Sequence, residues 1–113
     1  MKVDLVGSLF QQGLKYETEQ NWEKSAQCYE QVLLLNPRHV AAWVNLGGLH
    51  YHRRRLPQAR ECDEAALRID STYALAHFDL ANVLDDQGLL VAAFEHYKRA
   101  IELLPQYADA HYN

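Results

Sequence analysis

Residues 74–105 read ALAHFDLANVLDDQGLLVAAFEHYKRAIELLP, and this stretch decides the fold. Apolar residues recur at helical spacing over residues 74–87 and again over residues 90–104, which predicts two short amphipathic helices. Gly88 lies between them, where a helix commonly ends in a left-handed conformation that glycine adopts without steric cost. Pro105 ends the unit, because it has no amide hydrogen for a continuing helix. One such helical hairpin buries too little apolar surface to be stable alone, so it needs neighbours.

The neighbours are found at a constant offset along the chain. Ala100 corresponds to Ala66, and Leu80 corresponds to Leu46, without an insertion anywhere. Three units therefore span residues 6–39, 40–73 and 74–107, after a lead-in of residues 1–5, and residues 108–113 begin the first helix of a fourth. We expect an all-α fold with one domain over residues 1–113, an α-solenoid of stacked antiparallel helix pairs.

A helix–turn–helix period of this length, with small residues at fixed positions, resembles the tetratricopeptide repeat family. The residues that carry the resemblance are Trp43, Leu46, Gly47, Ala59 and Ala66 in the second unit, Leu80, Ala81, Ala93, Tyr97, Ala100 and Pro105 in the third, and Gly13, Tyr16, Tyr29 and Pro37 in the first. The resemblance covers nearly the whole chain. It implies a right-handed superhelix in which the first helix of each pair lines a concave groove that binds other polypeptides.

The resemblance also implies which side chains line this groove. They form a polar row and an apolar row along the first helices. The polar row is Gln11, Asn45, Asp79 and Asn113, the apolar row is Phe10, Val44, Phe78 and Tyr112, and Leu14, Gly48 and Asn82 lie beside them. An asparagine amide both donates and accepts hydrogen bonds, so such a row can pair with the main chain of an extended peptide. This row resembles the asparagine ladder of the O-linked N-acetylglucosamine transferase superhelix, from which Gln11 and Asp79 depart. The other interpretation, that these are solvent-facing polar residues without a ligand, stays open.

A second mechanism of the family is a clamp for the C-terminal carboxylate of heat-shock chaperones. The clamp uses lysine, asparagine, asparagine, lysine and arginine, and the corresponding positions here are Phe10, Leu14, Asn45, Leu75 and Asp79. Only Asn45 matches, and Asp79 would repel a carboxylate. Together with Asp85 and Asp86, Asp79 makes the third unit of the groove acidic. We therefore expect a protein or peptide partner that is neutral or basic.

Net charge and the length of the apolar runs further restrict the classes of partner and the location. The net charge of 11 − 15 = −4 argues against broad binding to nucleic acid or to anionic membranes. No apolar run approaches the roughly 18 residues of a membrane span, so we expect a cytoplasmic protein.

Cys28 and Cys62 fall on successive second helices, which lie roughly 8–10 Å apart and thus beyond the reach of a disulfide. We expect two free thiols, and with His96 they are too widely spaced for one metal ion, so no metal or cofactor is expected.

The second unit departs from the pattern at three places, one of which is Ser71 in place of the proline. His50, His52 and residues 53–55, which read RRR, crowd the turn between its helices, and Arg54 stands where Gly88 stands in the third unit. This basic turn is either a patch for an acidic partner or a set of cations favoured at a helix C-terminus. Asp63 occupies the position of Tyr29 and Tyr97. Since a carboxylate on a packing face is costly without a partner, we hypothesise an Asp63–His50 ion pair.

The sequence shows no catalytic constellation. No serine–histidine–aspartate arrangement and no glycine-rich phosphate loop is present, and His77 and His111 share the position of Trp43, which predicts a packing role. We expect no enzyme activity. Three hypotheses remain: an interaction module that binds an extended peptide, which leads; a structural segment that forms homodimers through its exposed C-terminal face, with Tyr107, Ala108, His111 and Tyr112; or the targeting arm of a larger enzyme such as a glycosyltransferase, because residues 108–113 stop within a repeat.

Overall fold

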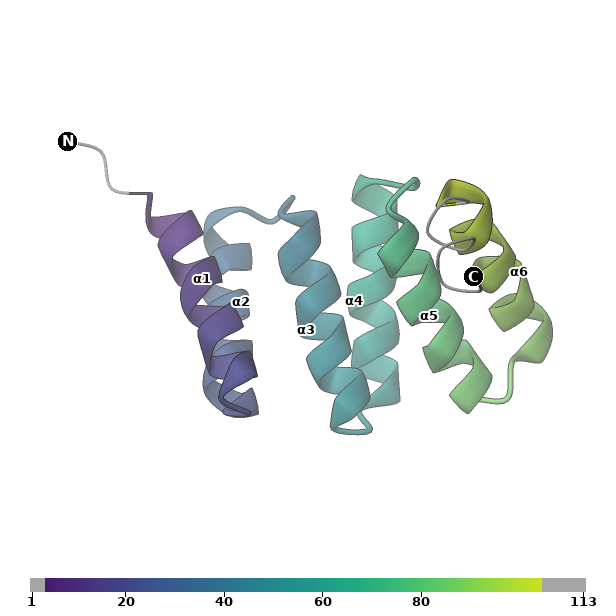
Figure 1. Ribbon diagram of the computed structural model, residues 1–113, viewed down its shortest axis with the longest axis horizontal. Helices are drawn as coiled ribbons and strands as arrows, with labels where there is room; N and C mark the ends of the chain where they lie inside the picture. Colours follow the sequence, from purple (N-terminus) through teal and green to yellow (C-terminus); the bar gives the residue numbers. More distant parts are fainter. Residues whose placement is uncertain (1–3, 105–113) are drawn as a thin grey trace, which may run out of the picture.

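The computed structural model describes residues 4–104, and this range consists of six α-helices joined by short turns. They are α1 (Leu5–Thr18), α2 (Trp22–Leu35), α3 (Val40–His52), α4 (Leu56–Ile69), α5 (Ala74–Asp86) and α6 (Leu90–Leu103) (Figure 1). The second helices start at Trp22, Leu56 and Leu90, which are equivalent positions of the three units. The expected all-α solenoid of helix pairs is confirmed. The expected fourth unit, with Tyr112 and Asn113, lies outside the described residues.

The helices form two layers along an elongated molecule of 47 × 29 × 27 Å. In Figure 1, α1, α3 and α5 follow one another from left to right, and α2 and α4 lie behind them. Successive helices run in opposite directions, as the short turns require. The first helices of the pairs therefore share one side of the molecule.

The turn inside each pair uses the same backbone conformation. Gln20, Arg54 and Gly88 have φ angles of 63°, 62° and 81°, which confirms the left-handed exit expected at Gly88. In each turn the amide of the next residue donates to the carbonyl five residues earlier: Asn21 to Tyr16 at 2.8 Å, Arg55 to His50 at 2.8 Å and Leu89 to Leu84 at 2.9 Å. These are the bonds of a Schellman-type helix end, so the local geometry repeats even where glycine is replaced.

Side-chain caps fix where helices begin. Asn21 is the N-cap of α2, and its side chain accepts a hydrogen bond from the Lys24 amide at 3.3 Å. Asp4 caps α1 and His39 caps α3 in the same way, by accepting from the amides of Gly7 and Ala42.

Small residues let the paired helices approach closely. The Ser25 hydroxyl donates to the Gly13 carbonyl at 2.7 Å, across the contact between α1 and α2. A Cβ added at Gly13 would lie 2.5 Å from the ring of Tyr29, and one added at Gly47 would lie 2.6 Å from the Asp63 carboxylate. Any larger residue at these two positions would push the helices apart.

The apolar core runs from one pair into the next. Tyr29 of α2 packs with Leu46 and Leu49 of α3 and with Cys62 of α4. Leu67 of α4 packs against the cluster that Leu80, Leu84 and Ala93 form between α5 and α6. Each pair thus buries its apolar side only with the help of its neighbour. None of the helices in residues 4–104 is long and apolar enough to cross a membrane.

Candidate functional site

The described residues predicted for the groove all lie on α1, α3 and α5. Gln11 is exposed and the Phe78 ring is 44% exposed, whereas six others are half-buried: Phe10, Leu14, Asn45, Gly48, Asp79 and Asn82. Tyr112 and Asn113 lie outside residues 4–104. The side of the molecule formed by α1, α3 and α5 is called the first-helix face below.

Val44 corrects the expected apolar row. Its side chain is only 2% exposed, and it packs in the core with Ala66 of α4 and Ala76 of α5. The reason is that α5 lies against both α3 and α4, which encloses this position. Val44 is therefore a core residue and offers no surface to a ligand.

Two aromatic pairs mark the ends of the first-helix face. The rings of Phe10 and Tyr29 are 5.7 Å apart between centroids, and those of Phe78 and Tyr97 are 5.5 Å apart in an edge-on arrangement. Both separations fall within the range of favourable aromatic contacts. In each pair, the tyrosine comes from the second helix and reaches toward the first-helix face.

These tyrosines also form hydrogen bonds with asparagine amides in or beside the polar row, a contact that repeat spacing alone did not reveal. Asn45 donates from its amide nitrogen to the Tyr29 hydroxyl at 3.4 Å, and that hydroxyl donates to Glu17 at 3.1 Å. Burial and the Glu17 charge raise the pKa of Tyr29 to about 12, so it remains a neutral donor. Tyr97 likewise donates to Asn82. Since an amide nitrogen carries two hydrogens, Asn45 is held in place and can still donate to a ligand.

Asp63 is buried without the partner expected for it. The residue is 0% exposed, and neither carboxylate oxygen has a hydrogen-bond partner among residues 4–104. The predicted Asp63–His50 ion pair is wrong, because the carboxylate lies over Gly47 while His50 lines a hollow elsewhere. Burial and the nearby Arg55 charge lower the pKa of His50, which further disfavours the charged imidazole that the pair would need.

Asp63 of α4 and Asp79 of α5 instead lie close enough for their charges to interact, and Asp63 is buried whereas Asp79 is half-buried. Burial is the main cause that raises the pKa of Asp63 to about 8, and the charges of Asp79 and Glu64 add to it. Burial raises the pKa of Asp79 to about 6. Near neutral pH the two groups therefore tend to hold one proton between them.

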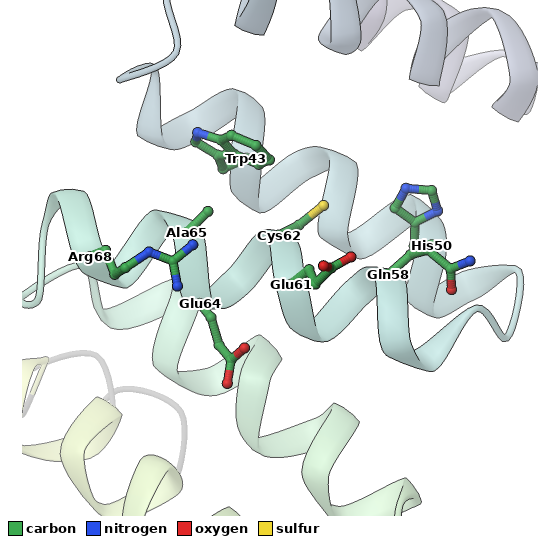
Figure 2. Close-up of a pocket in the computed structure, with 8 residues that line it drawn as sticks. All are labelled: Trp43, His50, Gln58, Glu61, Cys62, Glu64, Ala65 and Arg68. Atoms are coloured by element: carbon green, nitrogen blue, oxygen red, sulfur yellow. The ribbon is translucent and has the colours of Figure 1, made fainter.

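A hollow of about 420 Å³ lies on another part of the surface (Figure 2). Trp43 and His50 of α3 line it together with six residues of α4: Gln58, Glu61, Cys62, Glu64, Ala65 and Arg68. Burial raises the pKa of Cys62 to about 12, so its thiol stays protonated and is a poor nucleophile or metal ligand. Cys28 and Cys62 are both free and buried. Among the described residues, no three histidine, cysteine or acidic side chains come together to hold a metal ion.

The basic turn is tied to the next pair of helices. Arg54 forms an ion pair with Asp86 at 2.8 Å, which joins the turn after α3 to the end of α5. The guanidinium and a hydrogen bond from Tyr51 lower the pKa of Asp86. Because its charge is paired, Asp86 adds less to the acidity of the third unit than the sequence suggested.

His77 has the packing role expected from its repeat position. Its Nε2 lies 2.8 Å from the Ser71 carbonyl, as the Trp43 ring nitrogen lies 2.8 Å from the Pro37 carbonyl one repeat earlier. A carbonyl only accepts, so we assign the hydrogen of His77 to Nε2. Its Nδ1 then accepts from the Nδ1 of His96 at 3.0 Å.

Stacked helix pairs with a constant repeat period, small residues at the helix contacts and one shared first-helix face define a helical-repeat solenoid. The sequence profile described as tetratricopeptide repeat matches residues 10–74 and 64–108. The chain therefore belongs to the tetratricopeptide repeat family, whose members generally act as non-catalytic interaction modules.

Among characterised proteins, the tetratricopeptide repeat-containing protein trd-1 of Caenorhabditis elegans is 25% identical over 104 residues. The match covers 92% of this chain and only 14% of trd-1.

Solved structures show the same fold at low sequence identity. The second repeat domain of Spaghetti (RPAP3), bound to the HSP90 peptide SRMEEVD, has a TM-score of 0.85 at 16% identity and covers 88% of this chain and 93% of its own. The first repeat domain, bound to the same peptide, has a TM-score of 0.88 at 18% identity, and the match covers 93% of this chain and 83% of that domain's chain. MamA has a TM-score of 0.83 at 17% identity, and the match covers 92% of this chain and 61% of the MamA chain.

The buried carboxyl pair predicts that stability falls as pH rises. The pKa values of Asp63 and Asp79 are about 8 and about 6 in the folded chain. Above about pH 4, the folded chain therefore holds more protons than the unfolded chain. The free energy of unfolding should drop by on the order of 2–5 kcal/mol between about pH 5 and about pH 8. Urea unfolding at several pH values measures this change.

The matched variants are Asp63→Asn, which removes the buried charge, and Glu61→Gln, which removes an exposed charge from the same helix. Asp63→Asn should flatten most of the pH dependence, and Glu61→Gln should leave it unchanged. A slope that persists in Asp63→Asn would show that other groups cause it.

Proposed function

We propose that this chain is a protein-interaction module that binds an extended peptide segment along the first-helix face. The observation that carries the proposal is the position of Asn45. Its half-buried amide is fixed by Tyr29 on the middle helix of this face, between the surface rings of Phe10 and Phe78. A fixed amide supplies hydrogen bonds to a peptide main chain, and the rings on either side supply apolar contacts for alternate side chains.

The similar structures support a peptide as the ligand class. Two of them are repeat domains of Spaghetti (RPAP3) bound to the HSP90 peptide SRMEEVD. Their identities to this chain are only 16% and 18%, so they support the shape of the binding face and not the choice of peptide. The family's general role as an interaction module supports a binding function in place of catalysis.

The chemistry of the face disfavours an acidic peptide. Phe10, Leu14 and Leu75 offer no positive charge at the positions that resemble the carboxylate clamp, and Asp79 is a carboxyl group. A peptide that ends in acidic residues would meet repulsion here and no compensating cation. We therefore propose a neutral or basic peptide.

Two further statements belong to this proposal. We propose that the chain has no enzyme activity of its own, because the polar groups described on this face are engaged in positioning and show no nucleophile next to a base. We propose a cytoplasmic location, which the two free thiols support, since a reducing compartment keeps such thiols unoxidised.

Self-association is a second candidate, and the outer side of α6 favours it. Leu90, Val91 and Phe94 are 63%, 80% and 62% exposed. At the position of Phe94, Ala26 of the first unit packs against the next pair of helices. The α6 surface thus has the character of a stacking face, and a second copy of the chain would cover it. The third hypothesis, a targeting arm of a larger enzyme, stays a prediction.

Substitution of Asn45 tests the peptide-binding proposal. A ligand is first selected from an array of unstructured peptides, and its affinity is then measured by fluorescence anisotropy. Asn45→Ala should weaken binding by about tenfold, because it removes main-chain hydrogen bonds to the ligand. Gln27→Ala, an exposed change on α2, should leave the affinity unchanged.

Circular dichroism of both variants confirms that helicity is retained. Equal affinities for Asn45→Ala and Gln27→Ala in folded proteins would contradict binding on the first-helix face.

Sedimentation equilibrium tests self-association. If α6 stacks against a second copy, the mean mass should rise with concentration, and Phe94→Arg should abolish the rise because it places a charge in the apolar contact. Leu34→Arg is the matched control, since Leu34 is 83% exposed on α2. A monomeric mass at every concentration would exclude this candidate.

A further inference from the structure

The middle unit of the first-helix face lacks side chains that its neighbours have. Positions that lie one repeat apart can be compared directly across the three units. The first unit has Phe10, Leu14 and Tyr29, the third has Phe78, Asn82 and Tyr97, and the second has Val44, Gly48 and Asp63. Each residue of the second unit is smaller than its counterparts.

This loss of side-chain volume leaves open space at the centre of the face. The first and third units each present a phenylalanine in contact with a tyrosine, and the second unit has neither ring. A Cβ added at Gly48 would meet nothing within 4 Å. The open space beside Gly48, on α3 of the first-helix face, is called the central notch.

Two carboxyl groups occupy positions whose counterparts one repeat earlier form a neutral hydrogen bond between the first and second units. Tyr29 and Asn45 bond to each other through hydroxyl and amide, and their counterparts one repeat later are Asp63 and Asp79. Asp79 is half-buried on the first-helix face, and Asp63 is fully buried with both oxygens lacking a hydrogen-bond partner among residues 4–104. A buried carboxyl without a partner is costly, so the site has an unmet requirement for a cation or a donor.

The direction of Asp63 relates it to the central notch. The Tyr29 ring passes over Gly13, and its hydroxyl ends at the amide of Asn45 on the first-helix face. Asp63 passes over Gly47 in the same way but is shorter by a phenol ring. Its carboxyl therefore ends deeper in the helix contact than the Tyr29 hydroxyl does, behind the first-helix face.

We infer that the central notch is a subsite for a basic side chain of the bound peptide, arginine foremost, with Asp79 as its contact and Asp63 as the charge behind it. The inference rests on the proposed function and names the ligand residue that the face selects. A guanidinium group fits best, because its planar donors match a carboxylate and its faces pack against aromatic rings. The Phe78 ring, which is 44% exposed on the same helix as Asp79, offers such a face.

The accessibility of the two carboxyls sets their roles. Asp79 is the group that a ligand meets at the surface, whereas Asp63 acts mainly through its charge at close range in a medium of low dielectric constant. A bound cation favours the ionised form of both groups. Since the pKa values are about 6 and about 8 without ligand, binding near neutral pH should release a proton.

Nuclear magnetic resonance titration with small probes tests the subsite directly. The probes are N-acetyl-arginine amide, N-acetyl-lysine amide and the neutral analogue N-acetyl-citrulline amide. The arginine probe should shift the backbone amide signals of Gly48, Asp63 and Asp79 in proportion to its concentration, with a smaller effect for lysine and none for citrulline. Equal shifts with citrulline would overturn the inference, because the subsite would then not recognise charge.

Two variants and one control make the assignment specific. Asp79→Asn removes the contact charge, and Gly48→Leu fills the notch with the residue that the first unit has at Leu14. Each should weaken binding of the arginine probe at least about tenfold. Glu95→Gln removes an exposed charge from α6, outside the first-helix face, and should have no such effect. Unchanged binding in both Asp79→Asn and Gly48→Leu would overturn the subsite.

The same variants separate this inference from the proposed function. If Asn45→Ala weakens the array-selected peptide but Gly48→Leu and Asp79→Asn do not, the peptide-binding face stands and the basic subsite fails. If the arginine probe binds at the notch while Asn45→Ala leaves peptide affinity unchanged, the subsite stands and the proposed main-chain contact fails.

Discussion

No helix pair in this chain can bury its apolar side by itself, and the architecture follows from that constraint. Tyr29 packs against Leu46 and Leu49 of the next pair, and Leu67 packs against Leu80 and Leu84 of the pair that follows its own. Stacking in one direction is the arrangement that satisfies every pair in turn. It also aligns α1, α3 and α5 on one side (Figure 1), so the first-helix face is a consequence of how the core is completed.

Close contact between the paired helices decides which residues reach that face. Gly13 allows the Tyr29 ring to pass through the helix contact and present its hydroxyl to Asn45. Gly47 gives the same passage to Asp63, which carries a charge in place of a ring. The stability of the stack and the chemistry of the face are thus linked at one position in each pair. A change that improves packing at Asp63 would remove the carboxyl group that we propose to act on the ligand.

The fold could be predicted from the sequence, because a constant repeat offset fixes helices, turns and contacts together. Helix limits such as Leu90–Leu103 and the left-handed Gly88 follow from local rules of periodicity and backbone sterics. The site was predicted less completely. Repeat position placed Val44 in the apolar row, but burial depends on how tightly α5 lies against α3 and α4, which no local pattern encodes. The predicted ion pair of Asp63 was wrong for the same reason, because the direction of a side chain across a helix contact depends on the glycine beneath it.

The central claim is that a polypeptide lies along α1, α3 and α5, and hydrogen exchange of the chain with an array-selected peptide tests it most directly. Bound peptide should slow exchange of backbone amides on α3 and α5 around Gly48 and Asp79, and leave α6 unchanged. Protection confined to α6, or to the α4 residues around Cys62 that line the hollow in Figure 2, would place the ligand on another surface and contradict the account.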